Sequence, residues 1–195
     1  MIEIEPGGEG GLLALRLGRH VKLGRLLTLH VWAGQRTEVD LGDRSTFQTG
    51  CRLVLRGGRL RVGSDVFVRD LTQLKVTGGE LTLGDHVQLG RDCNLDCGRS
   101  ILLGSRVGLA ERASVVDSDH GHDGTDAFFM DQPLRSAPIA IGANTFVAAN
   151  AVVLRGASVG PNAVVGAGAV VRAGELQGGW LHAGVPARPL RALGG

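Results

Sequence analysis

The sequence predicts an all-β solenoid in which short strands wind into triangular coils. From Ile141 onward the chain reads in units of six residues, namely IGANTF, VAANAV, VLRGAS, VGPNAV and VGAGAV. The first position of each of these units is Ile or Val, and the fifth is Thr or Ala. A period of six matches neither a helix nor a simple alternating strand, but it fits a short strand followed by a tight corner. Three such hexads close a triangle, and we call this full turn a coil.

The same frame occupies the chain upstream of Ile141. Hexads begin at positions 41, 62, 83 and 103, so coils recur every 21, 21 and 20 residues. The residues beyond 18 fall at one corner, around Gly57-Gly58, Gly78-Gly79 and Gly98. We expect glycine to supply corner conformations that a Cβ would penalise. The predicted organisation is an irregular segment or first coil over 1–40, a solenoid over 41–175 and a tail over 176–195.

The composition of the chain narrows the classes of function. Aromatic residues make up 4% of the chain and Tyr is absent, so the core is predicted to be aliphatic. The net charge of +2 argues against a non-specific nucleic-acid binder. The uncharged run over 136–154 keeps the hexad rhythm, so we expect no membrane span, and the acidic start is unlike a signal peptide. Cys51, Cys93 and Cys97 match no zinc pattern and are predicted to be buried, reduced thiols of a cytoplasmic protein.

One long segment, residues 117–138, leaves the hexad pattern and reads DSDHGHDGTDAFFMDQPLRSAP. A regular array does not need such a loop, so the loop is a candidate for function. His120 lies where the chain leaves the stack, and an imidazole can accept and return a proton at neutral pH. His122 could orient a ligand, contact an acceptor or be a bystander. Asp117 and Asp119 could hold the imidazole tautomer or ionise at the surface.

The hexads, the Asp119-His120 loop, the IGANTF restart at Ile141 and the closing AGVPA at 183–187 resemble the hexapeptide-repeat acyltransferases. The likeness covers roughly residues 80–191 and is greatest to the branch of galactoside, maltose and xenobiotic acetyltransferases. The resemblance implies a left-handed parallel β-helix with an extruded loop and a short C-terminal tail. The handedness comes from the resemblance alone.

The same resemblance implies a CoA-dependent O- or N-acetyltransferase without a metal. Such an enzyme moves an acetyl group directly from acetyl-CoA to a hydroxyl or amine of a small molecule, most often a sugar or nucleotide-sugar. The family assembles as a homotrimer with active sites between subunits, and its loop reaches onto a neighbour. That contact would bury the apolar tip Phe128-Phe129-Met130, which could instead fold back on its own coil.

The resemblance also assigns roles to individual residues. His120 matches the general base, and Ala149 matches the residue whose N–H contacts the thioester carbonyl. The other matches to coenzyme A contacts are Phe146 (in place of a Trp, at the acyl pocket), Ala167 (pantetheine), and Arg172, Arg188 and Arg191 (phosphates and adenine). Residues 136–195 carry four Arg against one Glu, a charge of +3 that suits an anionic carrier.

The family's acceptor-binding Asn and Asp do not align with this chain. Gly90 and Gly98 fall near their places, and Asn94 and Asp96 are nearby substitutes. Two other functions remain open. A carbonic-anhydrase-like β-helix enzyme needs three converging His ligands for a metal. A non-catalytic binding solenoid needs neither the loop nor the AGVPA tail.

Overall fold

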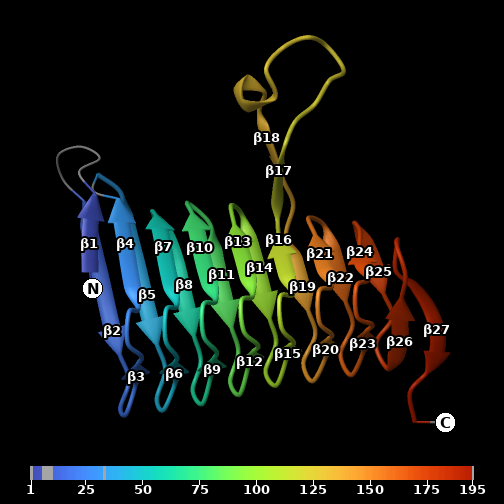
Figure 1. The fold of residues 1–195 in the computed structure, drawn as a ribbon, viewed down its shortest axis with the longest axis horizontal. Helices are drawn as coiled ribbons and strands as arrows, with labels where there is room; N and C mark the ends of the chain where they lie inside the picture. The colour runs from blue at the N-terminus through green and yellow to red at the C-terminus, as the bar shows by residue number, and fades with distance from the viewer. Residues whose placement is uncertain (1, 6–10, 33, 195) are drawn as a thin grey trace.

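The computed structural model describes residues 2–5, 11–32 and 34–194, and within these ranges the chain is built from short β-strands without an α-helix. The strands stack into three long sheets that form the walls of a triangular prism (Figure 1). Each coil contributes one strand to each wall in turn, and we call the walls sheets A, B and C. β1 and β2 lie at one end of the stack, and β26 and β27 lie at the other (Figure 1).

Sheets A and B each contain eight parallel strands. Sheet A consists, in spatial order, of β1 (Ile2–Glu5), β4 (Thr28–Trp32), β7 (Arg52–Arg56), β10 (Gln73–Thr77), β13 (Asn94–Cys97), β16 (Ser114–Val116), β21 (Val152–Leu154) and β24 (Val170–Val171). Sheet B consists of β2 (Leu12–Leu17), β5 (Arg36–Leu41), β8 (Gly58–Val62), β11 (Glu80–Leu83), β14 (Ser100–Leu103), β19 (Ile139–Ile141), β22 (Ala157–Val159) and β25 (Gly174–Leu176).

Sheet C contains nine strands, of which the last is antiparallel to its neighbour. It consists of β3 (Lys22–Leu23), β6 (Thr46–Phe47), β9 (Phe67–Val68), β12 (Gln88–Leu89), β15 (Gly108–Leu109), β20 (Phe146–Val147), β23 (Val164–Val165), β26 (Trp180–Ala183) and β27 (Arg188–Ala192). Residues 11–32 and 34–40 therefore already contribute strands to the walls, and the tail continues sheet C through β26 before β27 folds back.

The hexad pattern explains the core. Residues at the first position, such as Leu83 and Val147, and at the fifth position, such as Val87 and Ala151, are 0–1% exposed. Both positions point into the prism, and the core is almost wholly aliphatic, with Phe47 as its one fully buried aromatic side chain among the described residues. Because each coil buries its apolar side chains only against adjacent coils, stability accumulates along the stack.

Glycine has two different roles at the corners, and only one of them was predicted. Between sheets A and B, Gly57, Gly58 and Gly78 adopt positive φ values of 74–82°, as expected. At the other two corners the positive-φ residue is the fourth of the hexad, and it is usually not glycine; examples are Arg44 and Asn144. The expectation that glycine supplies the corner conformations thus holds at the corner between sheets A and B and not generally at the other two.

The glycine at the second hexad position instead permits close approach between coils. A Cβ on Gly84 would lie 2.6 Å from the backbone nitrogen of Ser105 in the next coil. A Cβ on Gly42 would lie 2.5 Å from the carbonyl carbon of Gly63. The repeated glycine is thus required by the short distance between successive coils. The corner residues with positive φ, in the left-handed (αL) conformation, can instead carry polar side chains.

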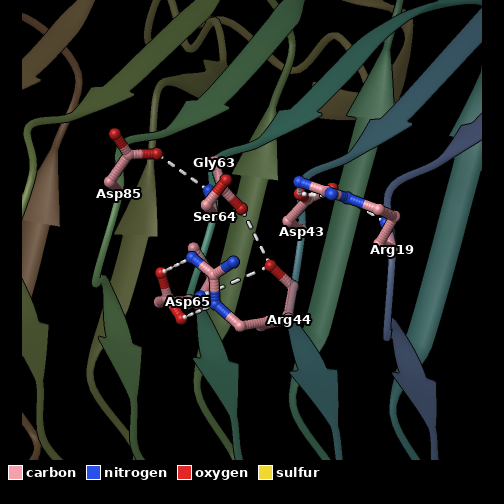
Figure 2. Close-up of polar contacts among 9 residues, drawn as sticks. Arg19, Asp43, Arg44, Gly63, Ser64, Asp65 and Asp85 are labelled. Carbon is pink, nitrogen blue, oxygen red and sulfur yellow. Dashed lines mark hydrogen bonds and ion pairs between the residues drawn. The ribbon is translucent and has the colours of Figure 1, made fainter.

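Polar side chains join successive coils at the corner between sheets B and C (Figure 2). Asp85 accepts a hydrogen bond of 2.8 Å from the backbone N–H of Ser64, one coil earlier. Asp43 accepts an equivalent bond from the N–H of Arg19. Arg44 pairs with Asp65 through both ends of its guanidinium, which keeps the pKa of that carboxyl below its usual range. The Asp43 and Asp85 carboxylates thus accept hydrogen bonds from backbone N–H groups that the turn leaves without a backbone partner.

The loop predicted over 117–138 is a long hairpin that stands clear of the prism (Figure 1). Its stem is formed by β17 (Ser118–His120) and β18 (Leu134–Ser136), which pair antiparallel, and its tip holds the 3-10 turn η1 (Phe129–Asp131). The hairpin leaves sheet A after β16 and re-enters sheet B at β19. It therefore occupies the corner that carries the surplus residues in the N-terminal coils.

Candidate active site

A buried carboxylate fixes the place where the hairpin leaves the stack. Asp117 is 0% exposed and accepts three backbone hydrogen bonds, from Gly98 at 2.6 Å, Arg99 at 2.8 Å and Ser100 at 2.7 Å. These donors form the corner of the preceding coil, so Asp117 ties the hairpin to that coil. The carboxylate is occupied by these backbone groups and by the neighbouring Cys97 thiol, and it does not hold the imidazole of His120.

The stem is held on its other side by an ion pair. The Nε of Arg155, which follows β21, lies 2.8 Å and 2.9 Å from the two carboxylate oxygens of Asp119. Asp119 is thus committed to Arg155 and not to His120. His122 accepts a 3.2 Å hydrogen bond from the N–H of Gly124 through Nδ1, which places it within the turn of the exposed tip.

His120 lies at the end of β17, opposite Leu134, and its side chain is exposed. Its ring and that of Phe129 meet edge to face, at a centroid distance of 5.5 Å and an interplanar angle of 89°. Among the described residues neither ring nitrogen has a hydrogen-bond partner. Phe128, Phe129 and Met130 are 46–60% exposed, so the apolar tip is only partly covered by its own chain. The imidazole is therefore positioned by the stem and by Phe129, with both nitrogens open to a ligand.

His120 opens into a cavity of about 480 Å³ between the hairpin and the edge of sheet A. Asp96 on β13 and Lys75 on β10 line it and form an ion pair of 2.8 Å. The remaining lining residues come from the stem, the tip and the corner, namely Arg56, Thr77, Gly98, Ser118, Asp119, Met130, Leu134 and Ser136. The structure thus brings Asp96, one of the substitutes for the missing acceptor residues, into the same cavity as the predicted base.

Arg56, Lys75 and Thr77 were not singled out from the sequence. The signal that could have found them is the 21-residue coil period, because parallel pairing sets Lys75 beside Asp96 and Arg56 beside Thr77. Asn94, the other substitute, pairs with Gln73 through a 3.2 Å side-chain hydrogen bond and does not line the cavity.

The residues matched to coenzyme A contacts lie elsewhere on the prism. Ala149 and Ala167 occupy successive coils at the corner between sheets C and A, where the N–H of Gly168 donates to the carbonyl of Ala149 at 2.9 Å. Phe146 is 47% exposed on sheet C. The three arginines are exposed, one after β24 and two on β27, namely Arg172, Arg188 and Arg191. None of these six residues lines the cavity of His120.

The corner at Ala149 differs from the same corner in an earlier coil. There, the N–H of Thr49 donates to the carboxylate of Asp70 at 3.1 Å. Ala149 and Ala167 occupy the equivalent hexad position, and within the described part of the chain no acceptor is found for either backbone N–H. Both alanines are at least partly exposed. Their N–H groups are therefore unpaired donors at a partly exposed corner, suited to a ligand carbonyl.

The cysteines are buried, and the potential metal-ligating side chains lie apart from one another in the described residues. Cys51, Cys93 and Cys97 are buried free thiols, as predicted, and burial raises the pKa of Cys51 and Cys93 to about 11 and that of Cys97 to about 12. In the portion of the chain that the structure describes, His, Cys, Asp and Glu side chains form no group of three or more suited to a metal ion. No helix over the same portion is long and apolar enough to cross a membrane.

Comparison with known proteins supports the interpretation of the hexads. Residues 138–173 match the family model described as bacterial transferase hexapeptide (six repeats). A probable acetyltransferase of Mycobacterium tuberculosis is 32% identical over 89 residues, which is 46% of this chain and 30% of that protein. The chain thus matches less than a third of the length of this curated relative.

Solved structures show the same fold at low sequence identity. The polySia-specific acetyltransferase NeuO aligns with a TM-score of 0.71 at 15% identity, over 98% of this chain and 86% of that chain. A point mutant of AntD, an N-acyltransferase from Bacillus cereus in complex with dTDP and coenzyme A, aligns with a TM-score of 0.59 at 13% identity, over 91% and 83%. Galactoside acetyltransferase in complex with coenzyme A aligns with a TM-score of 0.57 at 18% identity, over 74% and 66%.

These comparisons confirm the predicted fold and the predicted resemblance. The three parallel walls of the prism are those of the acetyltransferase β-helix, which NeuO shares over nearly the whole chain. The family-model match falls on the hexads from which the resemblance was first drawn. Residues 138–173 thus match bacterial transferase hexapeptide repeats, and the chain has the left-handed parallel β-helix fold, similar to acetyltransferases in sequence over 46% of its length and in fold over 98% of it.

Proposed function

We propose that the protein is an acyltransferase that moves an acetyl group from acetyl-CoA to a hydroxyl or amine of a small-molecule acceptor. The observation that carries the proposal is the cavity of about 480 Å³ in which His120, with both nitrogens open, faces the side of the prism that holds Asp96. The hexapeptide-transferase match and the relatives named as acetyltransferases support the reaction class.

In the proposed reaction His120 acts as the general base. It removes the proton from the acceptor hydroxyl or amine as that atom attacks the thioester carbonyl, and the C–S bond then breaks. The imidazolium returns its proton to the departing thiolate, so the reaction needs no net proton from solvent. A positioned general base contributes about 10²- to 10⁴-fold to the rate.

The donor side of the proposal uses the corner between sheets C and A. The accessible N–H of Ala149 would donate to the developing oxyanion, a contact worth about 10²- to 10³-fold. The accessible N–H of Ala167 would bind the pantetheine arm, and Phe146 would shape the acyl pocket. Arg172, Arg188 and Arg191 would meet the phosphates and adenine. The coenzyme A present in the AntD and galactoside acetyltransferase structures supports a donor of this class.

The geometry of one chain favours an active site shared between protomers. Asp119 is tied to Arg155, and Arg155 lies six residues beyond Ala149, across the width of sheet A. At ~3.3 Å per residue these six steps span up to about 20 Å, too far for direct transfer within one protomer. A homotrimer would bring the hairpin of one subunit to the Ala149 corner of the next and would cover the apolar tip. With three unpaired thiols, such an enzyme would suit the cytoplasm.

The acceptor class we propose is a sugar or nucleotide-sugar. NeuO is named for its action on polySia, AntD was solved with dTDP, and galactoside acetyltransferase is named for galactosides. The cavity volume lies in the range of ~300–1,000 Å³ found for small-molecule sites. An acceptor screen with acetyl-CoA, measured by release of the free thiol, tests this class directly.

The central test is His120→Ala. The variant should keep the thermal stability and coenzyme A affinity of the parent, because the imidazole is exposed and outside the predicted donor site, while kcat falls about 10²- to 10⁴-fold. Thermal melting, calorimetric titration with coenzyme A and the thiol assay give the three readouts. The neighbouring exposed His122→Ala is the matched control and should retain activity. Near-full turnover by purified H120A would refute the base assignment.

Complementation tests whether protomers share the site. Ala167→Trp should block the donor groove without affecting the core, because residue 167 is exposed. If one protomer supplies His120 and the next supplies the groove, co-refolding inactive H120A with inactive A167W restores part of the activity. A mixture as inactive as its components would place both halves of the site on one chain.

A further inference from the structure

The cavity extends well beyond His120 along the edge of sheet A. Arg56 pairs with Thr77 in parallel register, and the next coils bring Gly98 and Ser118 to the same corner. Neighbouring strands lie ~4.8 Å apart, so three steps from Arg56 to Ser118 span about 14 Å. Arg56 and His120 therefore line opposite ends of one elongated cavity.

Arg56 is held at its end of the cavity by an aromatic ring. Its guanidinium carbon lies 4.1 Å from the centroid of the Trp32 ring, on the adjacent strand β4. Stacking of this kind fixes the plane of the guanidinium and leaves the N–H groups at its edge free to donate. The side chain is exposed, and within the described ranges it has no acidic partner and no hydrogen bond.

The other charges in the cavity are already paired. Lys75 contacts Asp96 at 2.8 Å, and Asp119 contacts Arg155. Of the permanently charged side chains that line the cavity, Arg56 therefore remains without a counterion among the described residues. The cavity thus has a positive end that faces away from the imidazole.

A second hollow on the same corner provides an internal contrast. It is lined by three arginines, and two of them, Arg36 and Arg59, are committed to the buried carboxylate of Glu38 at 2.8 Å and 2.9 Å. Those contacts hold the pKa of Glu38 below its usual range. Arg36 and Arg59 are therefore used within the protein, and the third arginine, Arg99, donates to the backbone carbonyl of Ser136 at 3.5 Å. Arg56 is instead stacked on a ring, with its N–H groups left open.

We propose that Arg56, stacked on Trp32, is a binding site for an oxyanion, a carboxylate or a phosphate, carried by the acceptor. The acceptor class is thereby narrowed to an acidic or phosphorylated sugar whose reacting hydroxyl or amine lies at the His120 end. The planar guanidinium can donate two parallel hydrogen bonds to either oxyanion. That the bound sugar is the acetyl acceptor rests on the proposed acyltransferase function, whereas the oxyanion site at Arg56 does not depend on that function.

Binding can be measured without turnover through Trp32. The chain has two tryptophans, so Trp180→Phe leaves Trp32 as the only one. In this background we expect glucuronate or glucose 6-phosphate to change the fluorescence saturably, and the tighter of the two identifies the oxyanion. Neutral glucose should cause no such change. Arg56→Gln should weaken binding by about 10-fold or more, whereas Arg52→Gln, an exposed arginine of the same strand outside the cavity, should not.

Three results would overturn the site. They are the absence of a saturable response to either anion up to about 50 mM, well above a millimolar Kd, an equal response to glucose, and an unchanged response in R56Q. Arg56→Lys keeps the charge but loses the planar fork, so it should give an intermediate affinity. This second variant keeps the test valid if R56Q folds poorly.

Catalysis separates this inference from the proposed function. If both hold, kcat/KM for an anionic sugar exceeds that for its neutral counterpart by about 10-fold or more, and R56Q removes the advantage by raising the acceptor KM. The KM for acetyl-CoA should not change. If acetyl transfer depends neither on the charge of the acceptor nor on Arg56, the oxyanion site is refuted while the acyltransferase function is retained. If anion binding depends on Arg56 but no acetyl transfer occurs, the oxyanion site is supported and the acyltransferase function is refuted.

Discussion

The coils and the hairpin of residues 117–138 follow different physical rules, although they belong to one chain. In the coils, alternate side chains are buried in a continuous aliphatic core and the backbone is bonded to the coils on either side. In the hairpin, nearly every side chain beyond Asp117 is exposed, and the stem is held by one antiparallel pairing and one ion pair. The coils therefore supply the stability, and the hairpin supplies the candidate chemistry.

The strongest test of this division compares two leucines. Leu95→Ala removes a fully buried core side chain and should lower the free energy of unfolding by about 2–5 kcal/mol. Leu134→Ala removes a side chain that is 61% exposed in the hairpin and should change it by less than about 0.5 kcal/mol. Denaturant melts of both variants measure the two values. Similar losses would mean that the hairpin contributes to the core.

Asp117→Ala acts where the two regions meet. The substitution leaves three backbone N–H donors at the corner of the preceding coil without an acceptor. We therefore expect the free energy of unfolding to fall by about 3 kcal/mol. Hydrogen exchange at Gly98, Arg99 and Ser100 should accelerate, because these amides lose their acceptor. Asp117→Asn retains one acceptor oxygen and should lose about half as much. Unchanged exchange in D117A would show that the corner does not depend on the carboxylate.

The buried thiols allow the burial of the coil core to be tested through the pH dependence of the free energy of unfolding. Burial raises the pKa of Cys97 to about 12, while in the unfolded chain a thiol ionises near pH ~8.5. Above that pH the unfolded state loses the proton first, so stability falls by about 1.4 kcal/mol per pH unit for this thiol until its folded pKa is reached. Comparing the parent with Cys97→Ala at pH 7 and pH 9.5 isolates the effect. The stability difference between them should shift by about 1.4 kcal/mol, and a constant difference would contradict the burial of an ionisable thiol.

The smallest expected effect concerns the ion pair at the hairpin stem. Arg155 and Asp119 are 35% and 57% exposed, so their coupling energy should be about 0.2–1 kcal/mol. A double-mutant cycle with Arg155→Gln and Asp119→Asn measures it, and raised salt should reduce it. A coupling well above 1 kcal/mol would show that the stem is less solvated than its exposure indicates.

The fold was largely predictable because its information is local and repeated. Each hexad specifies an inward first residue, an inward fifth residue and a corner, and the surplus at Gly57-Gly58 marks the corner between sheets A and B. The roles of glycine were only partly predictable. Positive φ at Arg44 and Asn144 depends on the geometry of the corner, while the demand on Gly84 arises from the backbone of the next coil.

The candidate site was less predictable because its residues come from several coils. His120 could be predicted from its place where the repeat breaks. Nothing local in the sequence distinguishes Asp117, which binds three backbone amides, from Asp119, which pairs with Arg155. Arg56 stacks on a residue 24 positions earlier, so its role depends on strand register rather than on neighbouring residues.

In sheet B, the last strand before the hairpin, β14, pairs with the first strand after it, β19, as if the hairpin were absent. Ile101 pairs with Ile139 and Leu103 with Ile141. Thirty-eight positions separate each pair, against 20 between the partners of the preceding step, where Leu83 meets Leu103. An insertion of this size is thus accommodated without shifting the hydrogen-bond register. Exchanging the hairpin for another of different length or composition should leave the prism intact, which makes this corner a natural position for redesigning acceptor selectivity while the scaffold is kept.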